Sequence, residues 1–273
     1  MVIKGVKSMK YFGGCDVGST YTKCVVLDES GKIVSSVTIK SKINSEKSAE
    51  ESLDLAISKI PEISKPSDLS YLIGTGYGRN KVPFADENIS EISCHAMGVH
   101  ITNPSVKSII DIGGQDVKGI SIDTDGTVLS FSMNDKCAAG TGRFFDAMAN
   151  AFEMSIEEFS NLSLSAKNTI PITSQCTVFA ESEVITLVGE GKPRNEIASG
   201  IEIAVAKRCF IMAKKAGAKT SVTLTGGCAK NAGLKKAIED VLKIKVVELD
   251  IDPQLMGALG AAEYARQKGM EQE

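Results

Sequence analysis

Two Asp-x-Gly segments carry residue types suited to a metal-bound phosphate. Each places glycine and small polar residues after an aspartate: Asp16, Gly18, Ser19 and Thr20 in the first, and Asp111, Gly113, Gly114 and Gln115 in the second. Glycine lets the backbone come close to an anion, and the turn then points N–H groups at phosphate oxygens. A carboxylate would repel phosphate directly, so we expect Mg²⁺ or its waters to lie between them.

Further residues around these segments complete the expected chemistry. Asp16, Asp111 and Gln115 are the candidate catalytic residues, because glutamine can orient an attacking water without becoming charged. Lys23 adds positive charge near the first segment, where Ser19 and Thr20 offer hydroxyl donors. The sequence therefore predicts a site that binds a nucleotide phosphate with Mg²⁺.

A Gly-Gly turn between a predicted strand and a predicted helix is the third candidate binding element. It contains Gly226, Gly227 and, four residues on, Asn231. Such a turn can hold a flat adenosine moiety or a phosphate. The chain has no GxxxxGK[ST] motif, so this turn is not a P-loop.

Two cysteines suggest a different kind of chemistry. Cys137 and Cys176 each follow a short polar stretch and precede a predicted helix. A helix N-terminus lowers a thiol's pKa and stabilises an anionic metal cluster. Two thiolates are half of the usual ligand set of an iron–sulfur cluster, and a two-fold dimer would supply the other half. Position alone favours the alternative that Cys137 and Cys176 are ordinary buried or mildly reactive thiols.

An internal repeat positions the two Asp-x-Gly segments. Residues 16–34 and 111–129 align without a gap at an offset of 95, which indicates two copies of one supersecondary unit. Each copy is expected to form a bent hairpin of three strands, over 11–16, 20–27 and 32–39 in the first and 108–111, 117–122 and 128–133 in the second.

The rest of the chain alternates helices with strands. Helices are expected over 46–60, 91–101, 141–152, 177–188, 193–216, 232–242 and 253–267, and a capping box at Ser155–Glu158 predicts another short one. Further strands are expected over 69–74, 222–225 and 245–249, and residues 74–79 are expected to form a tight turn. This alternation predicts the α/β class.

Composition narrows the class of protein. The chain has 273 residues, 42% of them apolar, and a net charge of −3, which is typical of a soluble globular protein without a nucleic-acid-binding face. No apolar run reaches the roughly 20 residues that span a bilayer. The start, MVIKGVKSMKYF, lacks the apolar core of a signal peptide, so we expect a cytoplasmic protein. We expect Cys15, Cys24, Cys209 and Cys228 to be small buried hydrophobes.

The three phosphate-binding elements, taken in this order, resemble the acetate kinase, sugar kinase, Hsp70 and actin superfamily. The resemblance implies duplicated actin-like, ribonuclease H-like ATPase domains with an interdomain nucleotide cleft. It places the first domain over residues 1–100, with the helix 253–268 packed back on it, and the second domain over residues 101–252. It also implies binding of ATP and ADP.

The cysteine segments NDKCAAGTGRF and CTVFAESEV resemble the activator component of 2-hydroxyacyl-CoA dehydratases. This ATPase family includes the ATP-binding subunits of benzoyl-CoA reductase. The likeness extends to DVGST, GTGYGR, EISCHAMG, IDIGGQD, TGGCAKN and PQLMGALGAA; one departure is Tyr21, where a threonine is expected.

That resemblance implies a homodimer with one [4Fe–4S] cluster, held by Cys137 and Cys176 of each subunit. It also implies an anaerobic role. An electron from a ferredoxin or flavodoxin would pass, with ATP hydrolysis, to an iron–sulfur dehydratase or reductase.

A small-molecule kinase of the same superfamily is the main alternative. It would use the same ATP site with a sugar, and it would need a carboxylate base, for which Asp111, Asp116 and Glu181 are the candidates. A third hypothesis, an ATP-sensing scaffold, predicts nucleotide binding without iron and without partner-stimulated turnover.

Overall fold

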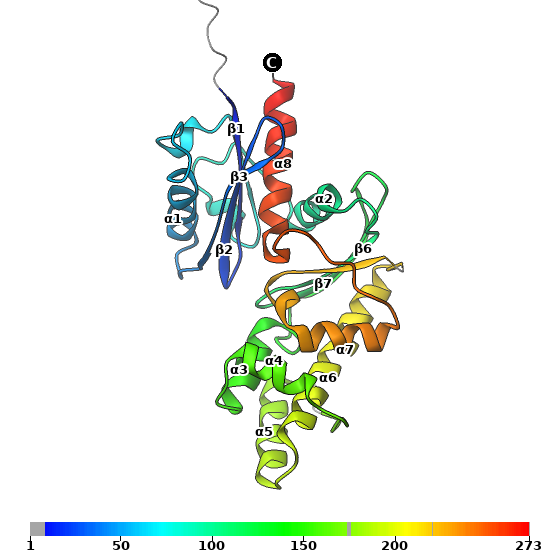
Figure 1. Ribbon diagram of the computed structural model, residues 1–273. Coiled ribbons are helices and arrows are strands. Elements are labelled where there is room, and N and C mark those ends of the chain that lie inside the picture. The colour runs from blue at the N-terminus through cyan, green and yellow to red at the C-terminus, as the bar shows by residue number, and fades with distance from the viewer. Residues whose placement is uncertain (1–8, 174–175, 220, 273) are drawn as a thin grey trace, which may run out of the picture. The chain divides into compact units, whose positions relative to one another are not determined.

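The computed structural model describes residues 9–173, 176–219 and 221–272 (Figure 1). The start of the chain that bears on a signal peptide and part of the polar stretch before Cys176 lie outside these ranges. The chain forms two compact units. The first comprises the chain up to Gly98 and from Leu255 onward, and the second comprises Val99–Gln254. Each contains one mixed sheet.

The sheet of the first unit has the order β3-β2-β1-β4-β5. The first repeat copy supplies the antiparallel strands β1 (Tyr11–Val17), β2 (Tyr21–Asp28) and β3 (Ile33–Lys40). Strand β4 (Tyr71–Thr75) runs parallel to β1, and the short β5 (Glu87–Asn88), which the sequence did not predict, runs parallel to β4. The ends of β1 and β4 bring Asp16 beside Thr75.

The sheet of the second unit has the order β8-β7-β6-β9. The second repeat copy supplies the antiparallel strands β6 (Ser108–Ile112), β7 (Val117–Ile122) and β8 (Val128–Asn134). Strand β9 (Val222–Thr225) runs parallel to β6, and its end brings Thr225 beside Asp111.

The two copies of the repeat match in detail. Asp16 pairs across the sheet with Lys23, and Asp111 pairs in the same way with Lys118. In each copy, the pairing of the second strand with the third shifts register at the equivalent place. The shift lies between Val26 and Leu27 in the first copy and between Ser121 and Ile122 in the second. The predicted duplication is therefore confirmed.

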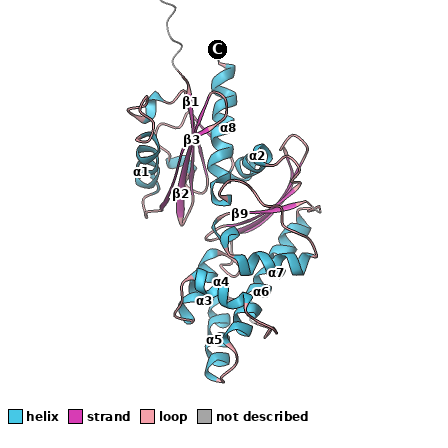
Figure 2. Cartoon of the chain, viewed as in Figure 1, coloured by secondary structure: helices cyan, strands magenta, loops and turns pink. Residues whose placement is uncertain are grey.

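Helices cover both faces of the first sheet. Figure 2 shows α1 (Ser45–Ile57) and α8 (Met256–Glu271) on opposite sides of its strands. Asn44 caps α1, because its side chain accepts the backbone N–H groups of Glu46 and Lys47. Helix α8 packs on β1 at Gly14, where a Cβ atom would lie 2.1 Å from the Ala258 carbonyl oxygen. Helix α2 (Glu91–Thr102) leads from this unit into the second.

The second unit is rich in helices: α3 (Gly142–Ala151), α4 (Ile156–Leu164), α5 (Thr177–Gly189), α6 (Arg194–Lys215) and α7 (Ala232–Leu242). The predicted capping box at α4 is confirmed, since Ser155 N–H donates to Glu158 Oε2 at 2.8 Å and Glu158 N–H donates to Ser155 Oγ at 3.2 Å. The core beneath these helices contains the edge-to-face aromatic rings of Phe144, Phe145, Phe152 and Phe159.

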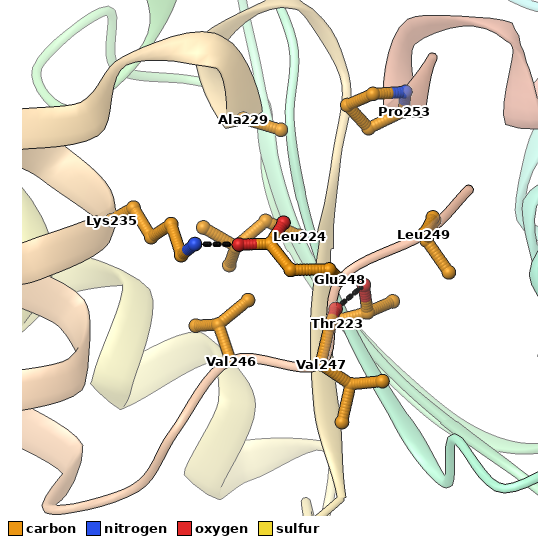
Figure 3. Close-up of a pocket in the computed structure, with 9 residues that line it drawn as sticks. All are labelled: Thr223, Leu224, Ala229, Lys235, Val246, Val247, Glu248, Leu249 and Pro253. Atoms are coloured by element: carbon orange, nitrogen blue, oxygen red, sulfur yellow. Dashed lines mark hydrogen bonds and ion pairs between the residues drawn. The ribbon is translucent and has the colours of Figure 1, made fainter. Parts of the chain in front are cut away.

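The strand predicted over 245–249 is wrong. Only a single bridge, between Val222 and Val246, connects this segment to the sheet. Side chains take bonds that a strand ladder would use: Val246 N–H donates to Glu239 Oε1 at 3.0 Å, and Thr223 Oγ1 donates to the Val247 carbonyl at 2.7 Å (Figure 3). The last helix also differs, because Pro253–Leu255 forms a 3₁₀ turn before α8 begins.

Across the described residues, none of the helices has the length and apolar character to span a membrane.

Candidate functional site

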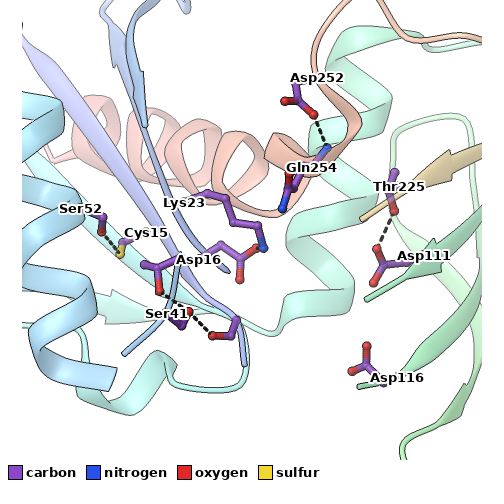
Figure 4. A network of polar contacts seen from close by, with 12 residues as sticks. Cys15, Asp16, Lys23, Ser41, Ser52, Asp111, Asp116, Thr225, Asp252 and Gln254 are labelled. Atoms are coloured by element: carbon purple, nitrogen blue, oxygen red, sulfur yellow. Dashed lines mark hydrogen bonds and ion pairs between the residues drawn. The ribbon is translucent and has the colours of Figure 1, made fainter. Parts of the chain in front are cut away.

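The first Asp-x-Gly segment ends strand β1 with a buried carboxylate. Asp16 is 1% exposed, and its Oδ2 atom accepts a hydrogen bond from Lys23 Nζ at 2.8 Å (Figure 4). Its Oδ1 atom has no hydrogen-bond partner within the described chain. Gly18 closes the following turn by donating to the Tyr21 carbonyl at 3.2 Å. Ser19, Thr20 and Tyr21 are exposed or half-buried around it.

Two glycines pack closely on the Asp16 carboxylate. A Cβ atom at Gly76, whose φ is +86°, would lie 2.3 Å from Asp16 Oδ1, and one at Gly257 would lie 2.8 Å from Oδ2. Gly76 also opens the tight turn predicted over 74–79, and Arg79 N–H donates to its carbonyl at 3.3 Å. A buried carboxylate oxygen that lacks a hydrogen-bond donor fits Mg²⁺ or one of its waters.

The second Asp-x-Gly segment ends β6 in a more saturated environment. Asp111 Oδ2 accepts from Lys118 Nζ at 3.1 Å, and Oδ1 accepts from Thr225 Oγ1 at 2.9 Å (Figure 4). Lys118 Nζ also lies 2.9 Å from Asp116 Oδ2. The sequence repeat, which aligns Lys118 with Lys23, could have indicated that Lys118 pairs with Asp111. No sequence pattern indicates Thr225, because it reaches Asp111 through the pairing of β6 with β9.

The Gly-Gly turn packs directly on the second segment. Gly226 has a φ of +81°, and a Cβ atom there would lie 2.4 Å from the Ile112 carbonyl oxygen. Gly227 is exposed at the start of a 3₁₀ turn (Gly227–Lys230). A side chain at Gly226 would push this turn away from Asp111, so glycine is required here.

Asn231 lies deeper than the sequence suggested. It is buried and caps α7, because its Oδ1 atom accepts the Leu234 N–H at 2.9 Å. Its Nδ2 atom donates to Glu202 Oε1 at 2.9 Å. With both amide atoms engaged inside the protein, Asn231 shapes the Gly-Gly turn rather than presenting a free side chain beside it.

Glu202 is a buried acid that sequence reasoning missed. Burial raises the pKa of its carboxyl to about 8, although the hydrogen bond from Asn231 acts in the opposite direction. Its Oε2 atom has no hydrogen-bond partner among the described residues. A glutamate in a long helix carries no sequence signal for such a position, because charged residues usually lie on the exposed face.

Gln115 lies beside a residue that was not predicted, Arg143. When the Gln115 amide presents its oxygen to the guanidinium, that oxygen is 2.6 Å from Arg143 Nη2 and 3.1 Å from Nη1. Two backbone bonds run alongside: Gly142 N–H donates to the Gly113 carbonyl at 2.9 Å, and Arg143 N–H donates to the Gly114 carbonyl at 3.0 Å. The second Asp-x-Gly segment is thus joined to the start of α3.

Cys137 and Cys176 are both exposed free cysteines. Cys176 is the N-cap of α5, and Cys137 precedes the turn into α3; these two helices pack on each other. Two surface thiols beside neighbouring helices fit the ligand set of a cluster shared between two chains.

The remaining cysteines are less accessible than this pair. Cys15, Cys24, Cys94 and Cys209 are buried, which confirms the prediction for Cys15, Cys24 and Cys209, whereas Cys228 is half-buried. Burial raises the pKa of the Cys15 and Cys209 thiols to about 12.

The hollow drawn in Figure 3 does not include any of the predicted site residues. It lies between β9, α7 and the segment 246–249, and an ion pair between Lys235 and Glu248 crosses it. Its volume of about 30 Å³ is near that of one water molecule, so it is too small for a nucleotide.

The aspartates, glycine turns and exposed thiols agree with a family match over most of the chain. Residues 14–265 match the description BadF/BadG/BcrA/BcrD ATPase family. The chain belongs to this ATPase family. Within the family, the activator of lactoyl-CoA dehydratase from Anaerotignum propionicum is 46% identical over 257 residues, covering 93% of this chain and 97% of that protein.

Two solved structures of this ATPase family are similar throughout. The activator of the 2-hydroxyisocaproyl-CoA dehydratase from Clostridium difficile, with bound ADPNP, is 42% identical with a TM-score of 0.89 and covers 96% of each chain. Component A of the Acidaminococcus fermentans (R)-2-hydroxyglutaryl-CoA dehydratase is 40% identical with a TM-score of 0.89, covering 96% of this chain and 99% of that one.

More distant likenesses establish the fold class. A putative N-acetylglucosamine kinase from Chromobacterium violaceum has a TM-score of 0.57 at 14% identity, covering 94% of this chain and 99% of that one. The duplicated actin-like fold is therefore shared with sugar kinases, and at this identity the likeness concerns the fold alone.

Proposed function

We propose that this chain is the ATPase that activates a 2-hydroxyacyl-CoA dehydratase, by delivering a low-potential electron to it in a step coupled to ATP hydrolysis. The observation that carries this function is the 46% identity to the lactoyl-CoA dehydratase activator over nearly the full length of both proteins. This identity is far higher than the 14% identity to the putative N-acetylglucosamine kinase, which shares only the fold.

ATP or ADP with Mg²⁺ is the proposed ligand of the phosphate-binding elements. Asp16 would hold Mg²⁺ or one of its waters, which its unpartnered Oδ1 atom supports. The phosphates would lie on the turns and donors at Gly18, Ser19, Thr20, Lys23, Gly113 and Gly114. Gly226 and Gly227 would support the adenosine, and Gln115 would orient the attacking water near Asp111.

Cys137 and Cys176 are the proposed ligands of a [4Fe–4S] cluster held between two copies of the chain. Such a cluster supplies a single electron at low potential when bound. Val178 and Phe179, which follow Cys176, are 66% and 68% exposed. Apolar side chains next to a shared metal site support a homodimer that covers them. A ferredoxin or flavodoxin is the proposed electron donor, and an iron–sulfur dehydratase or reductase is the acceptor.

The kinase alternative is weakened by the surroundings of two of its three candidate bases, Asp111 and Asp116. Asp111 accepts hydrogen bonds at both oxygens, and Asp116 is paired with Lys118. A carboxylate whose oxygens already contact a lysine or a hydroxyl is less available to contact the hydroxyl of a substrate.

A reconstitution experiment tests the proposed function. The protein, purified without oxygen, is mixed with reductant, MgATP and the dehydratase components that act on lactoyl-CoA, 2-hydroxyisocaproyl-CoA and (R)-2-hydroxyglutaryl-CoA. We expect ATP-dependent dehydration in at least one mixture and none when ADP replaces ATP. ATP hydrolysis that activates none of the three but is stimulated by an amino sugar would favour the kinase.

A further inference from the structure

The start of α3 is fastened to the phosphate-binding segment 113–115 by backbone and side chain together. The Gly113 and Gly114 carbonyls accept the N–H groups of Gly142 and Arg143, while the Arg143 guanidinium lies on the Gln115 amide. Arg143 thus contacts segment 113–115 at two places. A movement of that segment would pull on the first turn of α3.

The N-cap of α3, Thr141, is tied to Ala138, the residue that follows Cys137. Thr141 is buried, and both its N–H and its hydroxyl donate to the Ala138 carbonyl, at 3.0 and 2.7 Å. Gly140, with a φ of +99°, allows the chain to reverse between these two residues. Residues 138–141 therefore form a tight turn rather than a slack linker, and Cys137 is its neighbour.

The contact between these segments is close. A Cβ atom at Gly142 would lie 3.2 Å from Gly114 Cα and 3.5 Å from Cys228 Sγ. Segment 113–115 thus meets the first turn of α3 backbone to backbone at Gly142, and the Cys228 side chain of the Gly-Gly turn packs beside them. Close-packed elements transmit displacement because they cannot compress.

Arg143 occupies a position that helix energetics disfavour. It is the second residue of α3, where the helix dipole repels a cation and favours an acidic residue. An exposed arginine without a specific contact would make the helix slightly less stable at this position. Its contact with Gln115 accounts for it.

We propose that Arg143 is a positioning residue that holds the Gln115 amide and conveys changes in segment 113–115 to Cys137. The inference rests on the proposed binding of nucleotide at that segment. Gln115 stays paired with Arg143 when the nucleotide binds, so the two residues move together with the start of α3. Because coupling at equilibrium is reciprocal, a ligand that binds reversibly at Cys137 would change nucleotide affinity by the factor with which the nucleotide changes the affinity of that ligand.

The test measures the thiol itself in metal-free protein. In a Cys176→Ser background, the rate at which iodoacetamide alkylates Cys137 is followed by peptide mass spectrometry, with and without Mg²⁺ and ADPNP. We expect ADPNP to change that rate by about fivefold or more, the lower range of typical couplings. Arg143→Gln should abolish the ADPNP effect while retaining ADPNP binding, and Arg143→Lys should restore part of it.

Controls separate the possible failures. Lys136→Gln removes a positive charge next to Cys137 but keeps the contacts of Arg143, so it should retain the full ADPNP effect. Calorimetry on the parent protein reports ADPNP binding, and its absence there would refute the proposed nucleotide site. An equal ADPNP effect in the parent and in Arg143→Gln would overturn the coupling. Loss of ADPNP binding in Arg143→Gln would also overturn it, because Arg143 would then be a binding residue.

Discussion

Asp16 and Asp111 occupy equivalent places in the repeat but have different partners. Each pairs with a lysine across its hairpin, yet only Asp111 also receives a hydroxyl, from Thr225. The residue equivalent to Thr225 is Thr75, whose hydroxyl donates instead to the Ile89 carbonyl. Asp16 is thereby left with an oxygen that no described residue bonds, and we expect the two copies of the repeat to be specialised for different roles.

Asp16→Asn and Asp111→Asn should therefore have different effects. We expect Asp16→Asn to lower Mg²⁺-dependent ATP hydrolysis by at least about 100-fold, on the scale of losing a metal-ion contribution of a few kcal/mol. Asp111→Asn should mainly lower the melting temperature, because it weakens buried bonds to Lys118 and Thr225. Steady-state ATPase assays at several Mg²⁺ concentrations and calorimetric melting would distinguish them. Identical behaviour of both variants would contradict the specialisation.

Glu202 predicts a pH dependence of stability. Its folded-state pKa of about 8 lies above the usual value of 4.5, so folding favours the protonated acid. This contribution is fully present below about pH 4.5 and is lost as the pH rises through about 8. Glu202→Gln, which cannot ionise, should be more stable than the parent at pH 8.5 by on the order of 2 kcal/mol, and should differ little at pH 5.

Thermal unfolding at the two pH values measures the effect of Glu202→Gln. Glu196→Gln on the same helix is a suitable control, because Glu196 is only half-buried. A difference in stability that does not change between pH 5 and pH 8.5 would show that Glu202 is already ionised in the folded protein.

The helices and strands with a clear pattern of apolar residues agree best with the bounds predicted from the sequence. Strand β7 and helix α7 begin and end at the predicted residues. The prediction of a strand over 245–249 was wrong because the apolar pattern does not show which groups bond the backbone. Here the side chains of Glu239 and Thr223 take bonds that a neighbouring strand would otherwise make. Strand β5 has two residues, too few for any periodic pattern.

The capping box at α4 gives a prediction for a single element. Ser155→Ala removes the acceptor of the Glu158 N–H, so it should lower the free energy of unfolding by about 1 kcal/mol. Asn161→Ala, in the same helix, should be neutral or slightly stabilising, because alanine has the higher helix propensity. Denaturant titration of both variants gives the comparison, and an undiminished stability of Ser155→Ala would mean that the cap contributes little.

For the whole molecule, the sequence predicted the candidate site residues well. It predicted less well which other residues form hydrogen bonds with them. The aspartates and both surface cysteines stand in recognisable motifs. Thr225, Arg143 and Glu202 reach Asp111, Gln115 and Asn231 from strands and helices distant in sequence. Such contacts depend on tertiary structure, so no local sequence pattern predicts them.

The proposed shared cluster predicts an iron content for the proposed dimer. Protein purified without oxygen should be brown and contain about four irons per two chains, since one four-iron cluster would bridge the dimer. Cys137→Ala should lose the iron and keep nucleotide binding, whereas Cys209→Ala should keep both, because Cys209 is buried in the core. Iron analysis and native mass spectrometry measure these outcomes. Colourless, iron-free parent protein, or iron retained in Cys137→Ala, would refute the ligand assignment.

Helix α8 has a consequence for how the protein is made. It covers the first sheet at Gly14, yet the ribosome synthesises it only after the entire second unit. Until then, β1 lacks the helix that shields one of its faces, and its apolar surface stays open to water. The second unit can complete its own core first. The first sheet, although its strands are synthesised early, can therefore complete its packing only after the rest of the chain has been made.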